Sequence, residues 1–264
     1  MVHEALLAQC DELDGVKDGI VTNPPSCKFD PASLLCRDGD KPECLTAPQV
    51  KQINALYNGV RNPRTGERLA FGNTRGVEGL LGGRTQEAPA AEPALPSPFY
   101  RYFIFENESW DWTKFDFDKD VAFADKKLGN VMNNYDPDLS GLKAKGGKLI
   151  HYHGWADPQP SPENSVEYFQ EVQQKLGNTS DFYRLFMVPG MGHCQGGGTT
   201  DQFDKIGLIR AWVEEGKAPD AIIAQRMVNG KADRTRPLCP QPKIARYKGS
   251  GSTDDAANFS CAVP

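Results

Sequence analysis

Two segments of this sequence carry side chains that could act together as an acid and a base. Asp157 ends the run His151-Tyr-His-Gly-Trp-Ala-Asp157, and His193 ends the run Pro189-Gly-Met-Gly-His193. An imidazole titrates near neutral pH, so His193 could take a proton from a hydroxyl and return it to a leaving group. A carboxylate beside the ring would fix its tautomer and stabilise its charged form. The pair therefore suits ester hydrolysis by a serine nucleophile.

Each of these side chains follows an apolar run that is typical of a β-strand. The runs are residues 148–152 and 182–188, with a helical pattern between them. An acid and then a histidine, each after a strand, is the order of an α/β-hydrolase, whose serine precedes both. The sequence contains no Gly-x-Ser-x-Gly motif. We therefore predict an α/β protein, a partial α/β-hydrolase fold that holds the acid and the base without the serine.

The same region could support a different chemistry. His151 and His153 alternate along the first predicted strand, so their side chains face the same side of the sheet. Imidazole and carboxylate ligands suit zinc or iron. Together with Asp157 and His193, these histidines could hold a catalytic metal, and a metal-dependent hydrolase stays open as an alternative.

An acidic turn near the amino terminus could bind a cation. The run Cys10-Asp11-Glu-Leu-Asp14-Gly-Val-Lys-Asp18 places three carboxylates among glycines, and calcium prefers such oxygen ligands. The spacing is not that of an EF-hand. The turn is either a calcium site or a solvated acidic turn, and a non-catalytic calcium-binding fragment is a further alternative.

The seven cysteines indicate an oxidising compartment. No two of them form a Cys-x-x-Cys pair, which argues against a zinc ribbon. The sequons at Asn107, Asn178 and Asn258 are consistent with a secreted or periplasmic glycoprotein. Cys194, next to His193, is left over when neighbouring cysteines are paired. The predicted disulfides are Cys10–Cys27, Cys36–Cys44 and Cys239–Cys261, and the alternative is buried free thiols in a cytosolic protein.

Composition limits the partners. The chain of 264 residues has 39% hydrophobic and 25% charged residues, as a globular protein does. The net charge of −5 gives no basic surface for nucleic acid. No apolar run reaches the roughly 18 residues of a membrane span. We therefore expect neither a nucleic acid nor a membrane as partner.

The chain changes character near residue 140. Residues 1–140 are rich in proline, glycine and aromatics, with a Gly/Ala/Pro-rich loop at 78–98. Residues 141–264 alternate short strands with amphipathic helices, and no internal repeat is present. Three helices have clear signals. They are a helix from Thr46 to Gly59, one with Ser161 as N-cap and Pro162 in its first position that ends at Gly177, and one over 200–215 with Phe203, Ile206, Ile209, Trp212 and Val213 facing inward.

These runs together resemble the tannase and feruloyl esterase family. The similarity lies in residues 10–20, 153–158, 188–194 and 238–256, and it covers nearly the whole chain. It implies a secreted serine esterase that cleaves galloyl, feruloyl and related aromatic acid esters, including a terephthalate monoester. It also implies an α/β-hydrolase body with a large, loop-rich inserted lid that carries calcium. Residues 1–140 would be the lid domain, and 141–264 the carboxy-terminal part of the catalytic domain.

The resemblance assigns roles to single residues. Asp157 and His193 match the acid and base of the catalytic triad, and His153 matches a position that lines the substrate site in some relatives. Cys194 matches a cysteine that bonds to another cysteine just before the nucleophilic serine. The calcium site would use the carboxylates of Asp11, Asp14 and Asp18 and the backbone carbonyls of Val16 and Ile20.

The sequence departs from the family pattern in one respect. It contains no Cys-Ser dipeptide. The nucleophile, the oxyanion hole and the first strands of the sheet are therefore expected on a missing amino-terminal segment of the same enzyme. This chain alone is expected to be inactive.

Overall fold

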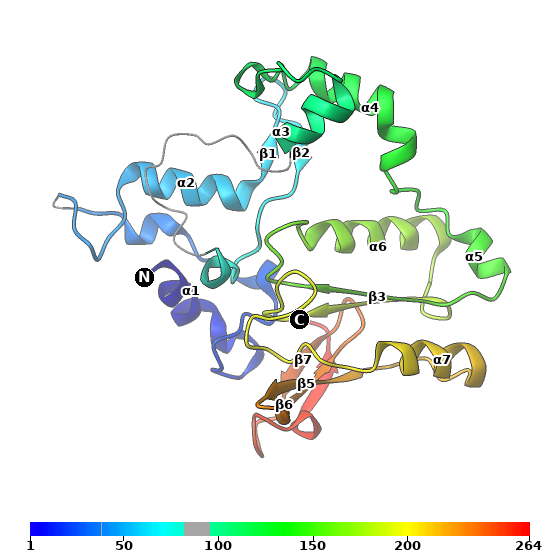
Figure 1. Cartoon of the computed structure of the whole chain (residues 1–264). Coiled ribbons are helices and arrows are strands. Elements are labelled where there is room, and N and C mark those ends of the chain that lie inside the picture. Colours follow the sequence, from blue (N-terminus) through cyan, green and yellow to red (C-terminus); the bar gives the residue numbers. More distant parts are fainter. Residues whose placement is uncertain (38, 82–95) are drawn as a thin grey trace. The chain divides into compact units, whose positions relative to one another are not determined.

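The computed structural model describes residues 1–37, 39–81 and 96–264, and Figure 1 shows its helices and strands. Most of the loop predicted at 78–98 lies outside the described residues. Contacts group the chain into two compact units. The first contains Met1–Gly59, Phe71–Gly82 and Pro137–Pro264, and the second contains Val60–Ala70 and Gly83–Asp136.

This grouping differs from the boundary predicted near residue 140. Residues 1–59 belong to the same compact unit as the carboxy-terminal strands. The reason is physical, because Val16 packs against Cys239 and Phe259 in a buried apolar cluster. Proximity in sequence could not show this contact. The roles of lid and catalytic domain remain predictions.

A parallel pair of strands forms the centre of the first unit. Strand β3 (Leu149–Gly154) pairs in parallel with β4 (Tyr183–Val188), from Leu149 opposite Tyr183 to Gly154 opposite Val188. Helix α6 (Glu163–Leu176) connects them and packs Phe169 and Val172 against the buried side chains of β4. The two strands and the helix that the sequence predicts are present.

The start of α6 differs from the prediction in detail. Ser161 is not the N-cap, because the helix begins at Glu163 with Pro162 before it. The backbone carbonyls of Ser161 and Pro162 accept the N–H groups of Asn164 and Ser165. The first turn is closed in this way, so it does not need the Ser161 hydroxyl. Gly177 ends the helix as predicted, with a positive φ of 74° that favours glycine.

Helix α7 (Lys205–Glu215) starts later than predicted. The Asp204 carboxylate caps it by accepting the Gly207 N–H at 2.8 Å. Trp212 is buried, but Ile206 and Val213 are 69% and 58% exposed, so the prediction that these two face inward is wrong. The inward face instead carries the buried Trp212 and the half-buried Leu208, which are four residues apart.

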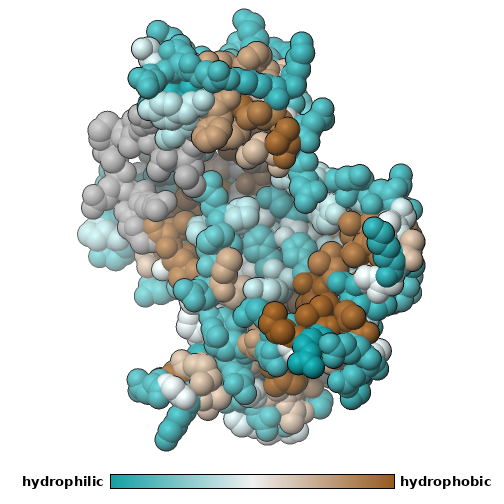
Figure 2. All heavy atoms as spheres, turned by 45° about the vertical axis from the view of Figure 1, so that its right-hand side comes forward, coloured by the Kyte–Doolittle hydropathy of each residue, from teal (hydrophilic) through white to brown (hydrophobic). Residues whose placement is uncertain are grey.

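The carboxy-terminal strands cover the other face of β4. Strand β5 (Ile222–Val228) is antiparallel to β6 (Lys231–Leu238), and β7 (Ile244–Tyr247) is antiparallel to β8 (Phe259–Ala262). Ile222 and Leu238 share a buried cluster with Phe186 and Met191. This cluster fixes the loop that follows β4. Figure 2 brings forward the side of the molecule that carries α5 (Ser140–Ala144) and α7. Apolar surface lies among polar side chains in this view.

The remaining elements include the helix that the sequence predicts from Thr46 to Gly59. Helix α2 (Ala47–Asn58) has the predicted boundaries, and Thr46 and Gln49 form a capping box at its start. No helix in the described ranges is long and apolar enough to cross a membrane. The other helices and strands are α1 (Val2–Cys10), β1 (Val60–Arg61), β2 (Arg68–Ala70), α3 (Pro96–Pro98), a π-helical turn (Phe99–Ile104), α4 (Lys119–Met132) and α5 (Ser140–Ala144), with 3₁₀ turns at Asp11–Asp14, Pro24–Ser26, Pro31–Leu34, Glu78–Leu80, Trp112–Lys114 and Ala256–Asn258.

The three predicted disulfides are confirmed. They join Cys10 to Cys27, Cys36 to Cys44, and Cys239 to Cys261. Each closes a short loop and stabilises the fold by about 2–4 kcal/mol. Cys194 is a free, exposed cysteine, as the count predicts.

Candidate active site

The carboxylate of Asp157 is held in a tight turn directly after β3. Its side chain is only 3% exposed. The Asp157 N–H donates to the Gly154 carbonyl at 3.2 Å, and the carboxylate Oδ1 accepts the Gln159 N–H at 2.8 Å. These two bonds fix the backbone of the turn and one of the two carboxylate oxygens.

The loops after β3 and β4 are bound to each other through their backbones. The Ala156 N–H donates to the Met191 carbonyl at 3.0 Å, and the Trp155 N–H donates to the Val188 carbonyl at 2.8 Å. A Cβ at Gly154 would collide with the Met191 carbonyl oxygen, so only glycine permits this approach. The two predicted catalytic loops are therefore brought together by main-chain contacts.

His193 lies within hydrogen-bond distance of Asp157. Its Nδ1 is 2.9 Å from the Asp157 Oδ2, while 63% of its side chain is exposed. An ionised carboxylate can only accept, so the Nδ1–H of a neutral His193 donates. Its Nε2 makes no hydrogen bond with the described residues. The ring thus keeps a free lone pair, as a general base requires.

A second histidine contacts the same carboxylate oxygen. His153 Nε2 is 3.2 Å from the Asp157 Oδ2, and its Nδ1 is 2.7 Å from the Ser165 hydroxyl on α6. Only 11% of the His153 side chain is exposed. Burial lowers the pKa of His153, although the negative charge of Asp157 opposes this effect. No local pattern points to Ser165, which meets His153 only in the folded chain.

His151 faces the same side of β3 as His153 but has another partner. Its Nδ1 is 2.9 Å from the Tyr183 hydroxyl. Burial is the largest cause that lowers the pKa of His151 to about 4. His151 therefore does not join His153, Asp157 and His193. Within the described residues, no three His, Cys, Asp or Glu side chains are arranged to hold a metal, so the geometry gives the metal-dependent alternative no support.

An open groove of 590 Å³ runs beside these side chains. All six residues of β3 line it, together with Asp157, His193 and Cys194. Because successive side chains of a strand point to opposite faces, a groove that contacts all of them follows the backbone edge. In the described part of the chain, β3 pairs only with β4. The groove thus follows the unpaired edge of β3.

The predicted calcium loop is hydrogen-bonded within itself. The Asp11 carboxylate accepts the N–H groups of Asp18 and Gly19 at 3.0–3.1 Å. The Asp14 carboxylate accepts the Val16 N–H at 2.9 Å and the Thr22 hydroxyl at 2.6 Å. Burial raises the pKa of Asp14. Two of the three predicted carboxylates therefore stabilise the turn directly.

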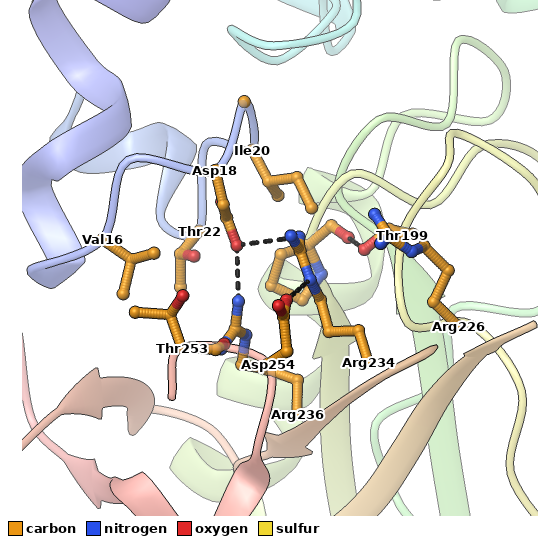
Figure 3. A network of polar contacts seen from close by, with 12 residues as sticks. Val16, Asp18, Ile20, Thr22, Thr199, Arg226, Arg234, Arg236, Thr253 and Asp254 are labelled. Carbon is orange, nitrogen blue, oxygen red and sulfur yellow. Dashed lines mark hydrogen bonds and ion pairs between the residues drawn. The ribbon is translucent and has the colours of Figure 1, made fainter. Parts of the chain in front are cut away.

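The third carboxylate, Asp18, pairs with two arginines of β6. Its Oδ2 contacts Arg234 and Arg236, and Arg234 also binds Asp254 (Figure 3). The Asp18 side chain is 7% exposed. Its Oδ1 is buried and makes no hydrogen bond with the residues that the structure describes. Neither arginine was predicted as a partner of Asp18, because nothing in their local sequence points to the loop.

The loop fits a hard cation in its donor set. The predicted ligands Asp11, Asp14, Val16, Asp18 and Ile20 offer only oxygen atoms, which calcium prefers. The buried, unpartnered Oδ1 of Asp18 is an atom that a cation would satisfy. The three carboxylates do not form a ready ligand cluster within the described ranges, so binding would require them to turn toward one another.

Comparisons with known proteins show which family this chain resembles. Residues 1–262 match the family described as tannase and feruloyl esterase. An uncharacterized esterase of Xanthomonas campestris is 36% identical over 98% of this chain and 54% of its own length. Mono(2-hydroxyethyl) terephthalate hydrolase of Piscinibacter sakaiensis is 34% identical over 100% of this chain and 51% of its own length.

Solved structures show the same fold. The crystal structure of feruloyl esterase B from Aspergillus oryzae superposes with a TM-score of 0.87 at 30% identity, over 99% of this chain and 55% of that one. Tannin acyl hydrolase from Aspergillus niger has a TM-score of 0.78 over 100% of this chain and 53% of that one. The chain therefore spans about half the length of the relatives that it matches.

Proposed function

The chain belongs to the tannase and feruloyl esterase family, and we propose that it carries the acid and the base of a serine esterase. The α/β-hydrolase-like fold predicted from the sequence is confirmed by the solved relatives. The observation that carries the proposal is the 2.9 Å contact between His193 Nδ1 and Asp157 Oδ2. It leaves Nε2 of His193 as the base, on the side where solvent and substrate have access.

In this mechanism Asp157 holds the proton of His193 on Nδ1. Nε2 takes the proton of the serine hydroxyl while the serine oxygen bonds to the ester carbonyl carbon. Nε2 then gives the proton to the alcohol oxygen as its bond to carbon breaks. Water then attacks the carbonyl carbon of the acyl-serine while Nε2 takes a proton from the water. Nε2 gives this proton to the serine oxygen as the bond from that oxygen to carbon breaks, and the acid is released. The serine itself is proposed to lie on a segment outside this sequence.

The unpaired edge of β3 supports the place that we propose for this segment. A two-stranded parallel sheet is rarely stable alone, because parallel sheets are normally covered on both faces and flanked by further strands. A strand added along the groove would pair with β3. Cys194 lines the same groove and is exposed. A disulfide from Cys194 to a cysteine beside the serine would then hold base and nucleophile within reach.

The proposed substrates are esters of aromatic acids, of the galloyl or feruloyl type. This proposal is supported by the relatives, which include a mono(2-hydroxyethyl) terephthalate hydrolase and a feruloyl esterase B. The first of these is named for a hydrolysis reaction on an ester of a benzene dicarboxylic acid. The role of His153 as a residue that lines the substrate site remains a prediction.

We also propose that the acidic loop binds one calcium ion. Asp11, Asp14 and Asp18 would supply carboxylates, and Val16 and Ile20 backbone carbonyls. When bound, the ion would join these oxygens and stabilise the loop, with no part in bond cleavage. The Cys10–Cys27 disulfide supports this role because it closes the chain around the loop.

A secreted or periplasmic location is proposed from the disulfides, which persist in oxidising compartments. Asn107 and Asn178, two of the predicted glycosylation sites, are exposed. Mass spectrometry of the protein from its natural source checks the location and the glycosylation together, since attached glycans require passage through a secretory compartment.

Turnover of methyl gallate and methyl ferulate tests the proposed function. The purified chain alone should hydrolyse neither ester. The chain co-expressed with the amino-terminal portion of the Xanthomonas campestris esterase, here called the complemented chain, should hydrolyse at least one. Turnover by the isolated chain that a chelator abolishes would instead support the metal-dependent alternative.

A further inference from the structure

We propose that His153 is a positioning residue that holds the carboxylate of Asp157 toward His193. The inference rests on the proposed function, in which Asp157 and His193 act as acid and base. It concerns a role that His153 would exert through Asp157, without contact to the reacting atoms.

The contacts on Asp157 Oδ2 are unequal. The oxygen accepts from His193, whose side chain is 63% exposed, and from His153, whose side chain is 11% exposed. A ring that is largely exposed to solvent restrains the carboxylate less than a buried ring does. The buried contact from His153 is therefore the one that determines the direction of Oδ2.

The hydrogen bonds of His153 also determine where its proton lies. An ionised carboxylate can only accept, so the contact with Asp157 favours a proton on Nε2 of His153, while a hydrogen bond to the Pro160 backbone opposes the loss of the ring's positive charge on burial. The Nδ1 of the neutral ring then accepts a hydrogen bond from the Ser165 hydroxyl, with 2.7 Å between the nitrogen and the oxygen. Burial favours the neutral ring at neutral pH. Ser165 is 8% exposed and lies in the first turn of α6, so the chain Ser165–His153–Asp157 is anchored to a helix.

Loss of the His153 contact would leave one interior bond on Asp157. That bond, from the Gln159 N–H, reaches the other oxygen, Oδ1. Oδ2 would then lose its one buried side-chain donor and would be held less firmly. His193 would lose its fixed acceptor, and its proton would distribute between Nδ1 and Nε2 as in a free imidazole.

His151 provides a matched control. It lies two residues earlier on the same strand, faces the same side and also has its Nδ1 on a hydroxyl, that of Tyr183. In the described part of the chain it makes no hydrogen bond or ion pair with Asp157. The same substitution at His151 and at His153 therefore changes the same kind of buried ring, with and without the link to the acid.

Nitrogen-15 NMR of the histidine side chains tests the proposal on the isolated chain, which needs no esterase activity. The chain contains only four histidines, so variants can assign each signal. His193 should carry its proton on Nδ1, and His153 on Nε2. In His153→Leu the His193 signals should move toward the average of the two tautomers. His151→Leu should leave them in place, and His153→Gln, which keeps a donor near Nε2, should restore them.

Two results would overturn the proposal. One is a folded His153→Leu variant whose His193 signals do not move. The other needs no variant, and is a proton on Nδ1 of His153 in the unmodified chain, which would direct its lone pair at Asp157. Since neither readout depends on turnover, a failed esterase assay with the expected tautomers would reject the proposed function and leave the positioning role intact.

Discussion

Two buried aspartates in this molecule use the same geometry with different partners. Asp157 Oδ2 accepts from His153 and His193, whereas Asp18 Oδ2 accepts from Arg234 and Arg236. Both carboxylates are at least nine-tenths buried. An imidazole can take up and release a proton, whereas a guanidinium stays charged. The first arrangement therefore suits proton transfer, and the second suits the joining of two distant segments.

The largest effect should follow from neutralising Asp157. In the complemented chain, Asp157→Asn should reduce kcat by about 10⁴-fold, because the amide would hold His193 in the wrong tautomer. Its stability should change much less, because no permanent charge is left behind. Steady-state kinetics and urea unfolding measure the two effects. A loss of less than tenfold in kcat would show that Asp157 is not the catalytic acid.

The arginine pair at Asp18 should show the opposite pattern. Arg236→Met should lower the free energy of unfolding by roughly 3–5 kcal/mol, because it breaks a buried ion pair. Urea unfolding of the isolated chain with a chelator present measures this loss. Arg226→Met is the matched control, since Arg226 pairs with the more exposed Asp233 and its loss should cost far less. Equal losses in the two variants would contradict the structural role of Asp18.

A third histidine, His151, lies beside the Asp157 site and should make the stability of the chain depend on pH. Burial lowers the pKa of His151 to about 4 from 6.5, so the unfolded chain binds more protons between these values. The stability that His151 contributes is present above pH 6.5 and is lost as the pH falls toward 4. By pH 5 the loss should reach about 2 kcal/mol. Urea unfolding at pH 7.5 and pH 5 should show a smaller loss for His151→Leu than for the unchanged protein.

The smallest effect concerns the unpartnered oxygen of Asp18. Calcium at ten times its Kd should stabilise the folded chain by about 1.4 kcal/mol. Thermal unfolding with calcium and with magnesium measures the difference, and Asp11→Asn should abolish it. Zinc that binds and is lost in His151→Leu or His153→Leu would favour the metal-dependent alternative. No stabilisation by calcium at millimolar concentration would leave the loop as a hydrogen-bonded turn.

The sequence predicted the partner of Asp157 but not the two arginines that pair with Asp18. The pairing of Asp157 with His193 follows from local order, because each residue comes directly after one of two adjacent parallel strands. The pairing of Asp18 with Arg234 and Arg236 joins positions 216 and 218 residues apart, and no local pattern encodes it. The predicted boundary near residue 140 differs from the compact units for the same reason.

Helix boundaries show the same limit on a smaller scale. The capping box at Thr46 is local, and the bounds of α2 were predicted correctly. The inward face of α7 depends on what packs against it, and periodicity alone placed Ile206 and Val213 wrongly. The hydrogen bond from Ser165 to His153 likewise depends on how α6 packs on β3, so the sequence could not indicate it.

The most direct test of the central claim is to find the nucleophile that His193 activates. A serine-directed phosphonate should label the complemented chain at a serine outside these 264 residues. It should leave the isolated chain unlabelled, and His193→Gln should prevent labelling of the complemented chain. Peptide mapping by mass spectrometry gives the position. A phosphonate bound to a serine of this chain, together with ester turnover by the isolated chain, would contradict the division of the catalytic residues between two segments.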